Sequence, residues 1–305
     1  MKTLALVATG VLAVTLGGCG TETTPSGDPS TSTGPPPATS SPVVDAEEEL
    51  VAHGILMQSD PAGPVEICIG GVAESLPPQC GGPILEGEFS WDDVEARSQS
   101  GVTWTDDAYF AVGHYSPGEP FQGTITLTRP VSAGPPEGFT PAEWGGSDFP
   151  QLCDDPTADV PDVDQAVRTQ GPEGFEEEQA LLERVQTLDG YVTSWVSDGG
   201  PLMNVVVNSD PEVARAALRE VFSGPLCVVQ RDLPSEEDVR AAQEALSAEH
   251  RELQVLGVGG AGVTGLLDVT VTIADQATVD RVHEIVSPWL TPDQIVISSA
   301  LQPLH

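Results

Sequence analysis

The stretch Leu266-Leu267-Asp268-Val269-Thr270-Val271-Thr272-Ile273-Ala274-Asp275 decides the fold of the C-terminal part of this chain. Apolar and polar residues alternate along it, which predicts a half-buried strand. The apolar residues Leu267, Val269, Val271 and Ile273 should face helices, and Asp268, Thr270 and Thr272 should face outward. Asp275 is a good N-cap for a following helix that buries Val279, Val282 and Val286 and ends before Pro288.

The same alternation of strands and capped helices extends over residues 186–305. Apolar runs predict strands at 191–196, 203–207, 226–230, 253–258, 266–274 and 294–299. Asp210 and Pro211 open a helix that should bury Val213, Ala217 and Val221. Ser235 opens another that should bury Val239, Ala242 and Leu246. From Leu226 onward the order is βαββαβ, which predicts a ferredoxin-like α+β domain preceded by an extra β-β-α.

A glycine-rich run, Gly257-Val258-Gly259-Gly260-Ala261-Gly262, matches the G-x-G-x-x-G pattern of dinucleotide sites. Such a site needs a helix directly after the glycines, because the pyrophosphate rests on the helix N-terminus. Here a strand follows, so we predict a hairpin loop and no bound nucleotide.

Residues 46–132 read as an all-β domain, a small barrel or a sandwich. Short apolar segments at 53–58, 65–69, 88–91, 101–105, 109–115 and 122–129 are separated by Gly- and Pro-rich breaks. Aromatic residues in this region can fill the core or form a ligand-stacking face, and core filling is the favoured interpretation: Trp91, Trp104, Tyr109, Phe110, Tyr115 and Phe121.

Four cysteines follow Cys19, and their even number in an exported chain predicts two disulfides with three possible connectivities. We favour Cys68–Cys80 inside the β domain, and Cys153–Cys227 between the middle of the chain and the last domain. A zinc site is the alternative, but neither CxxC nor paired histidines accompany these cysteines.

Residues 133–185 form an acidic, Pro- and Gly-rich linker that ends in a short helix from about residue 175. The aspartates between Cys153 and Asp164 lack the spacing, the glycine and the final glutamate of an EF-hand loop. A solvated linker is therefore preferred to a Ca²⁺ site.

Charge excludes several classes of function. Asp and Glu number 47 against 11 Lys and Arg, the net charge is −36, and Lys2 is the only lysine. Nucleic acid is not an expected partner, because phosphate contacts need clustered basic residues. Attraction to anionic lipid is excluded for the same reason. Schiff-base chemistry is excluded because no lysine remains once the signal is removed.

The N-terminal stretch indicates where the protein is located. Lys2, an apolar run and small residues have the form of a secretory signal too short to span a bilayer. Leu16-Gly17-Gly18-Cys19 resembles the lipobox of bacterial lipoproteins, which implies a signal peptide at 1–18 and lipid (palmitate) on Cys19. A disordered Ser/Thr/Pro/Gly tether of ~30 Å would occupy 19–45. Ordinary signal cleavage is the alternative. We expect an extracytoplasmic location, with the membrane contacted only through the Cys19 lipid.

Two further resemblances concern the folded part. Residues 67–83, with Cys68 and Cys80 in a Ser-x-Pro-Pro-Gln-Cys context, resemble a segment of an uncharacterised actinobacterial membrane lipoprotein family. That likeness implies an envelope lipoprotein without a known activity. Residues 191–246 resemble the propeptide modules of secreted chymotrypsin-like proteases through Tyr191, Trp195, Val205-Val206-Val207, Asp210-Pro211 and Val228-Val229. No protease motif accompanies them, so this likeness concerns the fold and, faintly, protein binding.

No catalytic constellation emerges from the sequence. The five histidines lack metal spacing, His283-Glu284 lacks the second histidine of H-E-x-x-H, and Gly146-Ser147-Asp148 lacks the closing glycine of a nucleophile elbow. The first hypothesis is a non-enzymatic, lipid-anchored envelope protein that binds a protein or cell-wall partner through a sheet edge or face, with neither cofactor nor metal. The alternatives are a hydrolase with a spatially assembled site and a carrier of a small ligand or cation.

Overall fold

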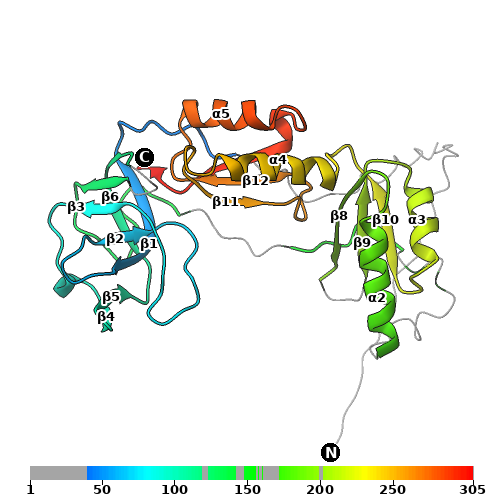
Figure 1. The fold of residues 1–305 in the computed structure, drawn as a ribbon, viewed down its shortest axis with the longest axis horizontal. Coiled ribbons are helices and arrows are strands. Elements are labelled where there is room, and N and C mark those ends of the chain that lie inside the picture. The colour runs from blue at the N-terminus through cyan, green and yellow to red at the C-terminus, as the bar shows by residue number, and fades with distance from the viewer. Residues whose placement is uncertain are drawn as a thin grey trace, which may run out of the picture. The chain divides into compact units, whose positions relative to one another are not determined.

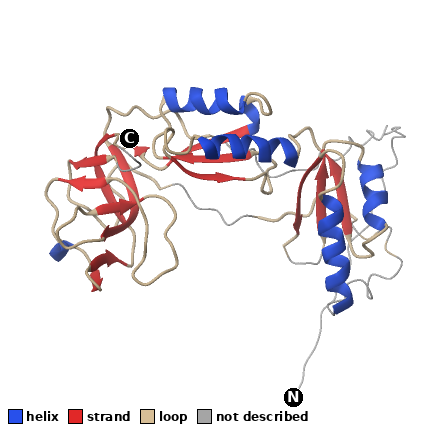
Figure 2. Cartoon of the chain, viewed as in Figure 1, coloured by secondary structure: helices blue, strands red, loops and turns tan. Residues whose placement is uncertain are grey.

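The structure is a computed structural model that describes residues 40–118, 123–141, 148–155, 157, 160, 172–198 and 202–304. The predicted signal, Cys19 and most of the tether therefore lie outside the described residues. The described chain is α+β, with a nearly all-β part followed by two helix-and-sheet units (Figures 1 and 2).

The β part is a closed barrel, one of the two predicted architectures. Five strands follow one another around it in the order β2-β3-β7-β6-β1, and β1–β2 pairing closes the ring. Only β3 and β7 are parallel. This Greek-key arrangement is that of an OB-type barrel. The strands are β1 Leu50–Gln58, β2 Glu66–Cys68, β3 Ile84–Glu86, β6 Tyr109–Ser116 and β7 Thr124–Leu127.

Short elements around the barrel were anticipated only in part. The strand predicted at 101–105 is β5 (Val102–Thr105), which forms a hairpin with β4 (Ala96–Gln99) and extends the sheet beyond β1. Neither β4 nor β14 (Gln302–Pro303), which pairs with the start of β1, was predicted. The strand predicted at 88–91 is wrong: a 3-10 turn at Trp91–Asp93 is capped there by the Ser90 side chain. Runs of two to four residues are too short to show a period of two.

Residues 172–299 contain two copies of one α-β-β-α-β unit, which we call repeat 1 and repeat 2 (Figure 1). Repeat 1 consists of α2 Pro172–Val185, β8 Tyr191–Val196, β9 Met203–Val207, α3 Pro211–Arg219 and β10 Leu226–Gln230. Repeat 2 consists of α4 Glu236–Ala248, β11 Val255–Gly259, β12 Leu267–Val271, α5 Gln276–Val286 and β13 Ile295–Ser299.

Pairing within the two sheets agrees residue by residue. In each sheet the middle strand pairs antiparallel with the first strand and parallel with the third. A register shift occurs at the same place in both hairpins, between Tyr191 and Thr193 and between Val255 and Gly257. Beyond the third strand, the amides of Arg231 and Ala300 each donate to the last residue of the middle strand at 2.9 Å. Val207 and Val271, the two acceptors, are therefore equivalent.

The predicted ferredoxin-like unit is not confirmed, because its four strands do not share one sheet. Leu226–Gln230 pairs with β9 in repeat 1, whereas the other three strands form the separate sheet of repeat 2. The reason is the path of the chain through α3. This crossover helix returns the chain beside β9, so β10 completes a sheet with the preceding hairpin.

Helices α4 and α5 bury all but one of the residues expected of them, and α3 does not. Val239, Ala242, Leu246, Val282 and Val286 are buried in the repeat 2 core, and Val279 is partly buried against it. In α3 the predicted face of Val213, Ala217 and Val221 is wrong, because Ala214 and Leu218 are buried and Val213 is 67% exposed. The helix turns toward the stripe that includes Leu218 and Phe222, whose side chains bury more apolar area.

The central strand of repeat 2 requires one correction. Leu267, Val269 and Val271 enter the helix-side core as predicted, and Asp268 is exposed. The strand ends at Val271, however, and Ile273 packs with Leu301 into the barrel core. Thr272, expected to face outward, is buried and donates both N–H and Oγ1–H to the carbonyl of Gln254.

Candidate functional site

The histidines of the described chain lie on β1, β6 and α5 and in the segment after α4. His53 stacks on Phe110 with ring centroids 4.1 Å apart, and burial lowers the pKa of this histidine. His250 contacts the carbonyl of Ser247 at 2.7 Å. His114 belongs to a different element, β6. In the described part of the chain, no three His, Cys, Asp or Glu side chains are placed to hold a metal ion. Of Gly146-Ser147-Asp148, only Asp148 is described.

The aromatic residues of the barrel fill space in its interior and beneath its hairpins. Trp104, Tyr109, Phe110 and Tyr115 are each buried, Trp91 is half-buried, and Phe121 lies outside the described residues. Tyr115 also donates its hydroxyl to Gln254 Oε1 at 2.7 Å. Core filling, the favoured interpretation, accounts for these side chains better than a stacking platform does.

The usual ligand face of OB-type barrels is acidic in this chain. In such barrels the outer face of the second and third strands binds oligonucleotides or oligosaccharides. Ile67 and Leu85 point into the core, which places Glu66 and Glu86 on the outer face of β2 and β3. Carboxylates repel phosphate groups.

The four cysteines form the two disulfides that the sequence favours. Cys68–Cys80 closes a loop within the barrel, and Cys153–Cys227 joins the linker to β10; the Cα atoms are 5.8 Å apart in both pairs.

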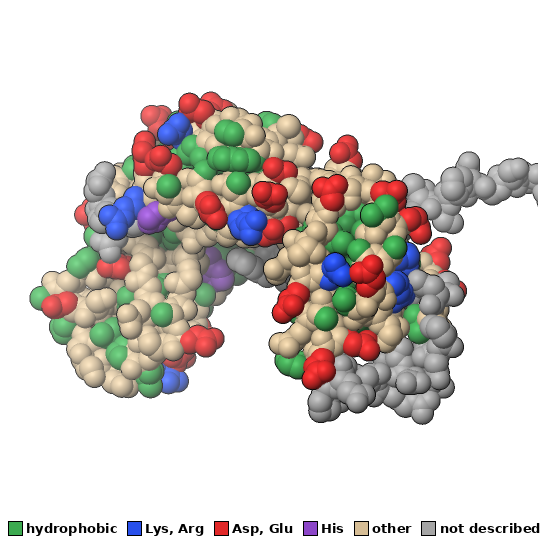
Figure 3. Space-filling view, turned by 45° about the vertical axis from the view of Figure 1, so that its right-hand side comes forward, with side chains coloured by type: hydrophobic (Ala, Val, Ile, Leu, Met, Phe, Trp, Pro, Cys, Tyr) green, Lys and Arg blue, Asp and Glu red, His purple; other side chains and the backbone are tan. Residues whose placement is uncertain are grey.

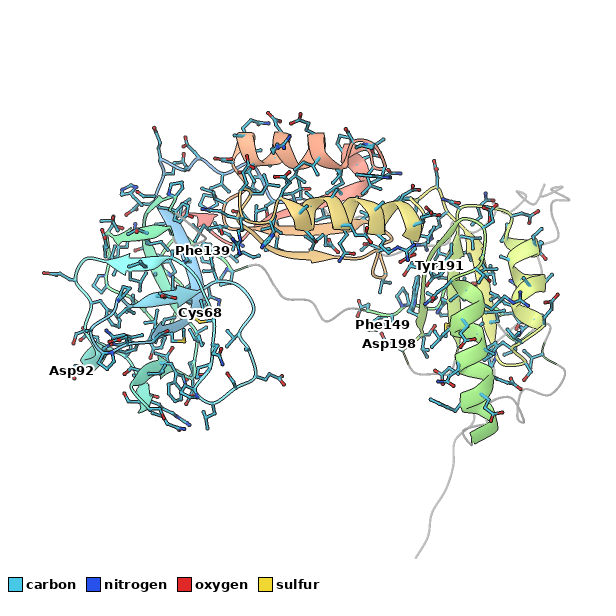
Figure 4. The ribbon with its side chains drawn as sticks, viewed as in Figure 1. Cys68, Asp92, Phe139, Phe149, Tyr191 and Asp198 are labelled. Carbon is cyan, nitrogen blue, oxygen red and sulfur yellow. A yellow bond between two sulfur atoms is a disulfide. The ribbon has the colours of Figure 1, made fainter. Side chains whose placement is uncertain are left out.

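In repeat 1, the sheet face opposite the helices is covered by a segment that we call the clamp, Phe149–Cys153. Phe149 and Asp198 exchange two hydrogen bonds of 2.8 Å, since each backbone N–H donates to the other residue (Figure 4). Further along, Trp195 Nε1 donates to the carbonyl of Pro150 at 2.9 Å. The disulfide then fixes the end of the clamp to β10.

Asn204 is the polar centre of this covered face. It is fully buried; its Oδ1 accepts the N–H of Leu152 at 3.0 Å and its Nδ2 donates to Ser197 Oγ at 2.7 Å. Leu152, Val192, Trp195, Val206 and Cys227 complete an apolar cluster around it. Because all its polar atoms are satisfied, the amide stabilises the clamp without a desolvation penalty.

In repeat 2, no segment among the described residues covers the corresponding sheet face as the clamp does in repeat 1, and we call it the open face. Both helices lie on the other side of the sheet (Figure 1). Gly257, Gly259 and Asp268 are exposed, Thr270 and Ser298 are half-buried, and Val296 is buried. Burial nonetheless raises the pKa of Asp268, and no described residue makes a hydrogen bond or ion pair with its carboxylate.

The outer edge of β13 in repeat 2 is occupied by the chain itself. Ser41 donates its N–H to the carbonyl of Ile297 at 2.9 Å, and the N–H of Ile297 donates to Ser40 Oγ at 3.0 Å. Val44, two residues past Pro42, donates to the carbonyl of Ala274 and is buried. This edge of the sheet is therefore not free to pair with another strand.

Sequence reasoning located Asp268 on an outward face but missed the clamp, because nothing in Phe149–Cys153 marks it as packing on a sheet. The Cys153–Cys227 pairing was the one available signal. Comparison with protein-family models, with curated proteins and with solved structures finds no match. Within the described ranges, no helix is long and apolar enough to cross a bilayer.

Proposed function

We propose that this chain is a lipid-anchored protein of the extracytoplasmic membrane face that binds an envelope protein or cell-wall partner without chemistry of its own. The observation that carries the proposal is Leu16-Gly17-Gly18-Cys19 followed by a polar tether, in a chain whose remaining four cysteines form two disulfides. Disulfides form and persist in oxidising compartments, which supports export.

The folded part has the packing of a stable binding domain. Its buried side-chain polar atoms all have partners in the described structure. Acidic side chains are scattered over the visible surface and do not gather in one patch (Figure 3). Such a surface favours solubility beside an anionic membrane.

Metabolic labelling with an alkyne analogue of palmitate tests the anchor. Wild-type protein should take up the label and sediment with membranes, and Cys19→Ser should do neither. Cys68→Ser/Cys80→Ser is the matched control, because it replaces two other cysteines, which form a disulfide, without touching Cys19 and should keep the label. Label retained by Cys19→Ser would refute the anchor. Photo-crosslinking in cells that repeatedly returns no envelope partner would refute the binding role.

A further inference from the structure

The repeats provide an internal comparison for the open face. Asn204 pairs across the sheet with Trp195 and Cys227, and Asp268 pairs with Gly259 and Val296. Asp268 therefore occupies the position from which Asn204 accepts the backbone N–H of the clamp. The same backbone geometry, with the same acceptor position, is present in repeat 2, where Asp268 is exposed and no described segment lies over it.

The open face also gives direct access to the backbone. Where repeat 1 has the bulky Trp195, repeat 2 has Gly259, and a Cβ there would lie 3.3 Å from Asp268 Cβ. Cβ atoms placed on Gly257 or Gly260 would meet nothing within 4 Å. Glycines at such positions allow another chain to approach the backbone closely.

We propose that the open face of repeat 2 binds an extended, positively charged segment of a partner polypeptide. This segment crosses the sheet as the clamp crosses repeat 1, and Asp268 accepts one of its N–H groups. The inference rests on the proposed binding function and names the surface and the chemistry of the partner.

Charge selects among the possible occupants. Asp268 replaces a neutral amide by a carboxylate, and hydrogen bonds from cationic or N–H donors to a carboxylate are the stronger kind. The chain carries a net charge of −36, so a second copy or a phosphate-bearing polymer is repelled, whereas a basic segment is attracted.

The state of Asp268 supports the same assignment. Burial raises the pKa of its carboxyl group, with no described donor to offset the desolvation. A donor supplied by a ligand would satisfy this group, as the N–H of Leu152 satisfies Asn204.

A peptide that copies the clamp is a direct probe. Acetyl-Lys-Phe-Pro-Gln-Leu-Lys-amide carries the Phe149–Leu152 sequence between two lysines, and its partner peptide has glutamates in place of the lysines. Titration into the full mature lipoprotein, held in zwitterionic nanodiscs, should show binding of the lysine peptide only. Asp268→Lys should weaken that binding about tenfold or more, and Asp268→Asn less, because an amide still accepts a hydrogen bond.

Asp280→Lys is the matched control. Asp280 is an exposed carboxylate on α5, outside the open face, and accepts from Gln276 Nε2 at 2.7 Å. The same charge change there should leave peptide affinity unchanged. Amide hydrogen exchange of β11–β13 should be the same in both variants, which separates lost binding from lost folding.

Several results would overturn the proposal. They are equal affinity for the two peptides, no effect of Asp268→Lys, Asp268-dependent binding of soluble peptidoglycan fragments instead, or an Asp268-dependent dimer in light scattering. In cells, a photo-crosslinker at Ser298 should capture a partner that one at Ala277 on α5 does not. If Asp268→Lys still captures the partner in full, the open face is not the binding site, although the proposed binding function would stand. Absent acylation would instead count against the anchor alone.

Discussion

Repeat 1 and repeat 2 have the same element order, the same pairing and a register shift at the same position, yet one sheet face is sealed and the other is open. The difference lies in a few positions. Trp195, Asn204 and Cys227 hold the clamp in repeat 1, and Gly259, Asp268 and Val296 replace them in repeat 2. One backbone arrangement can thus either bury a segment of its own chain or present a surface, and side chains at three register positions decide which.

The largest effect is expected when the disulfide that fixes the end of the clamp to β10 is removed. Cys153→Ser/Cys227→Ser releases a cross-link that spans 74 residues, which should cost repeat 1 about 4 kcal/mol. Native-state hydrogen exchange should show faster opening of β8–β10 and little change in β11–β13. Equal loss of protection in both repeats would mean that they do not open independently.

A reciprocal exchange at the equivalent position comes next. Asn204→Asp places a carboxylate at a fully buried site and removes the donors to Ser197 and Trp195, so repeat 1 should lose about 3 kcal/mol at neutral pH. Native-state hydrogen exchange of β8–β10 at increasing urea concentration measures it. A variant as stable as the wild type would show that the clamp does not desolvate this position.

Which side of α3 is buried can be tested by truncating one side chain on each side of the helix. Leu218→Ala removes a fully buried side chain and should destabilise repeat 1 by about 2 to 3 kcal/mol. Val213→Ala, on the exposed face, should change stability by less than about 0.5 kcal/mol. Thermal unfolding monitored by circular dichroism compares the two, and the reverse ranking would restore the face predicted from sequence.

Matched changes to the helix N-caps test whether equivalent positions in the two repeats contribute equally to stability. Asp210 accepts from the N–H of Glu212 at 2.9 Å, and Asp275 from the N–H of Thr278 at 2.8 Å. Either aspartate replaced by alanine should destabilise its own repeat by about 1 kcal/mol. Hydrogen exchange in α3 and α5 reports each effect, and strongly unequal losses would contradict the equivalence.

The smallest expected effect concerns Asp268 and has a defined pH dependence. Its pKa is raised in the folded protein, so the native state binds the proton more tightly than the unfolded chain, and stability falls as pH rises through the interval between the two pKa values. Asp268→Asn removes this penalty and should slightly stabilise repeat 2 at neutral pH. The gain should vanish below the pKa of an unfolded aspartate, about 3.9. Urea midpoints measured across that range test the sign.

Much of the local structure could be predicted from the sequence because it depends on neighbouring residues. Asp210, Ser235 and Asp275 each accept a backbone N–H in the first turn of their helix, as predicted for N-caps. The strands at 191–196, 203–207 and 226–230 have the predicted bounds, and the glycine run is part of a hairpin. The lipobox at Cys19 stays a prediction, since it lies outside the described residues.

What the sequence by itself determined is therefore the order of strands and capped helices over residues 186–305 and the N-caps of the helices, because period and caps act within a few residues along the chain. Only the tertiary structure decided which strands share a sheet, which side of α3 is buried, where Ile273 packs and that Phe149–Cys153 crosses repeat 1. These choices depend on contacts between segments far apart in sequence. Competing arrangements differ in how much apolar surface they bury and in how many polar groups find hydrogen-bond partners. A local sequence pattern contains neither quantity.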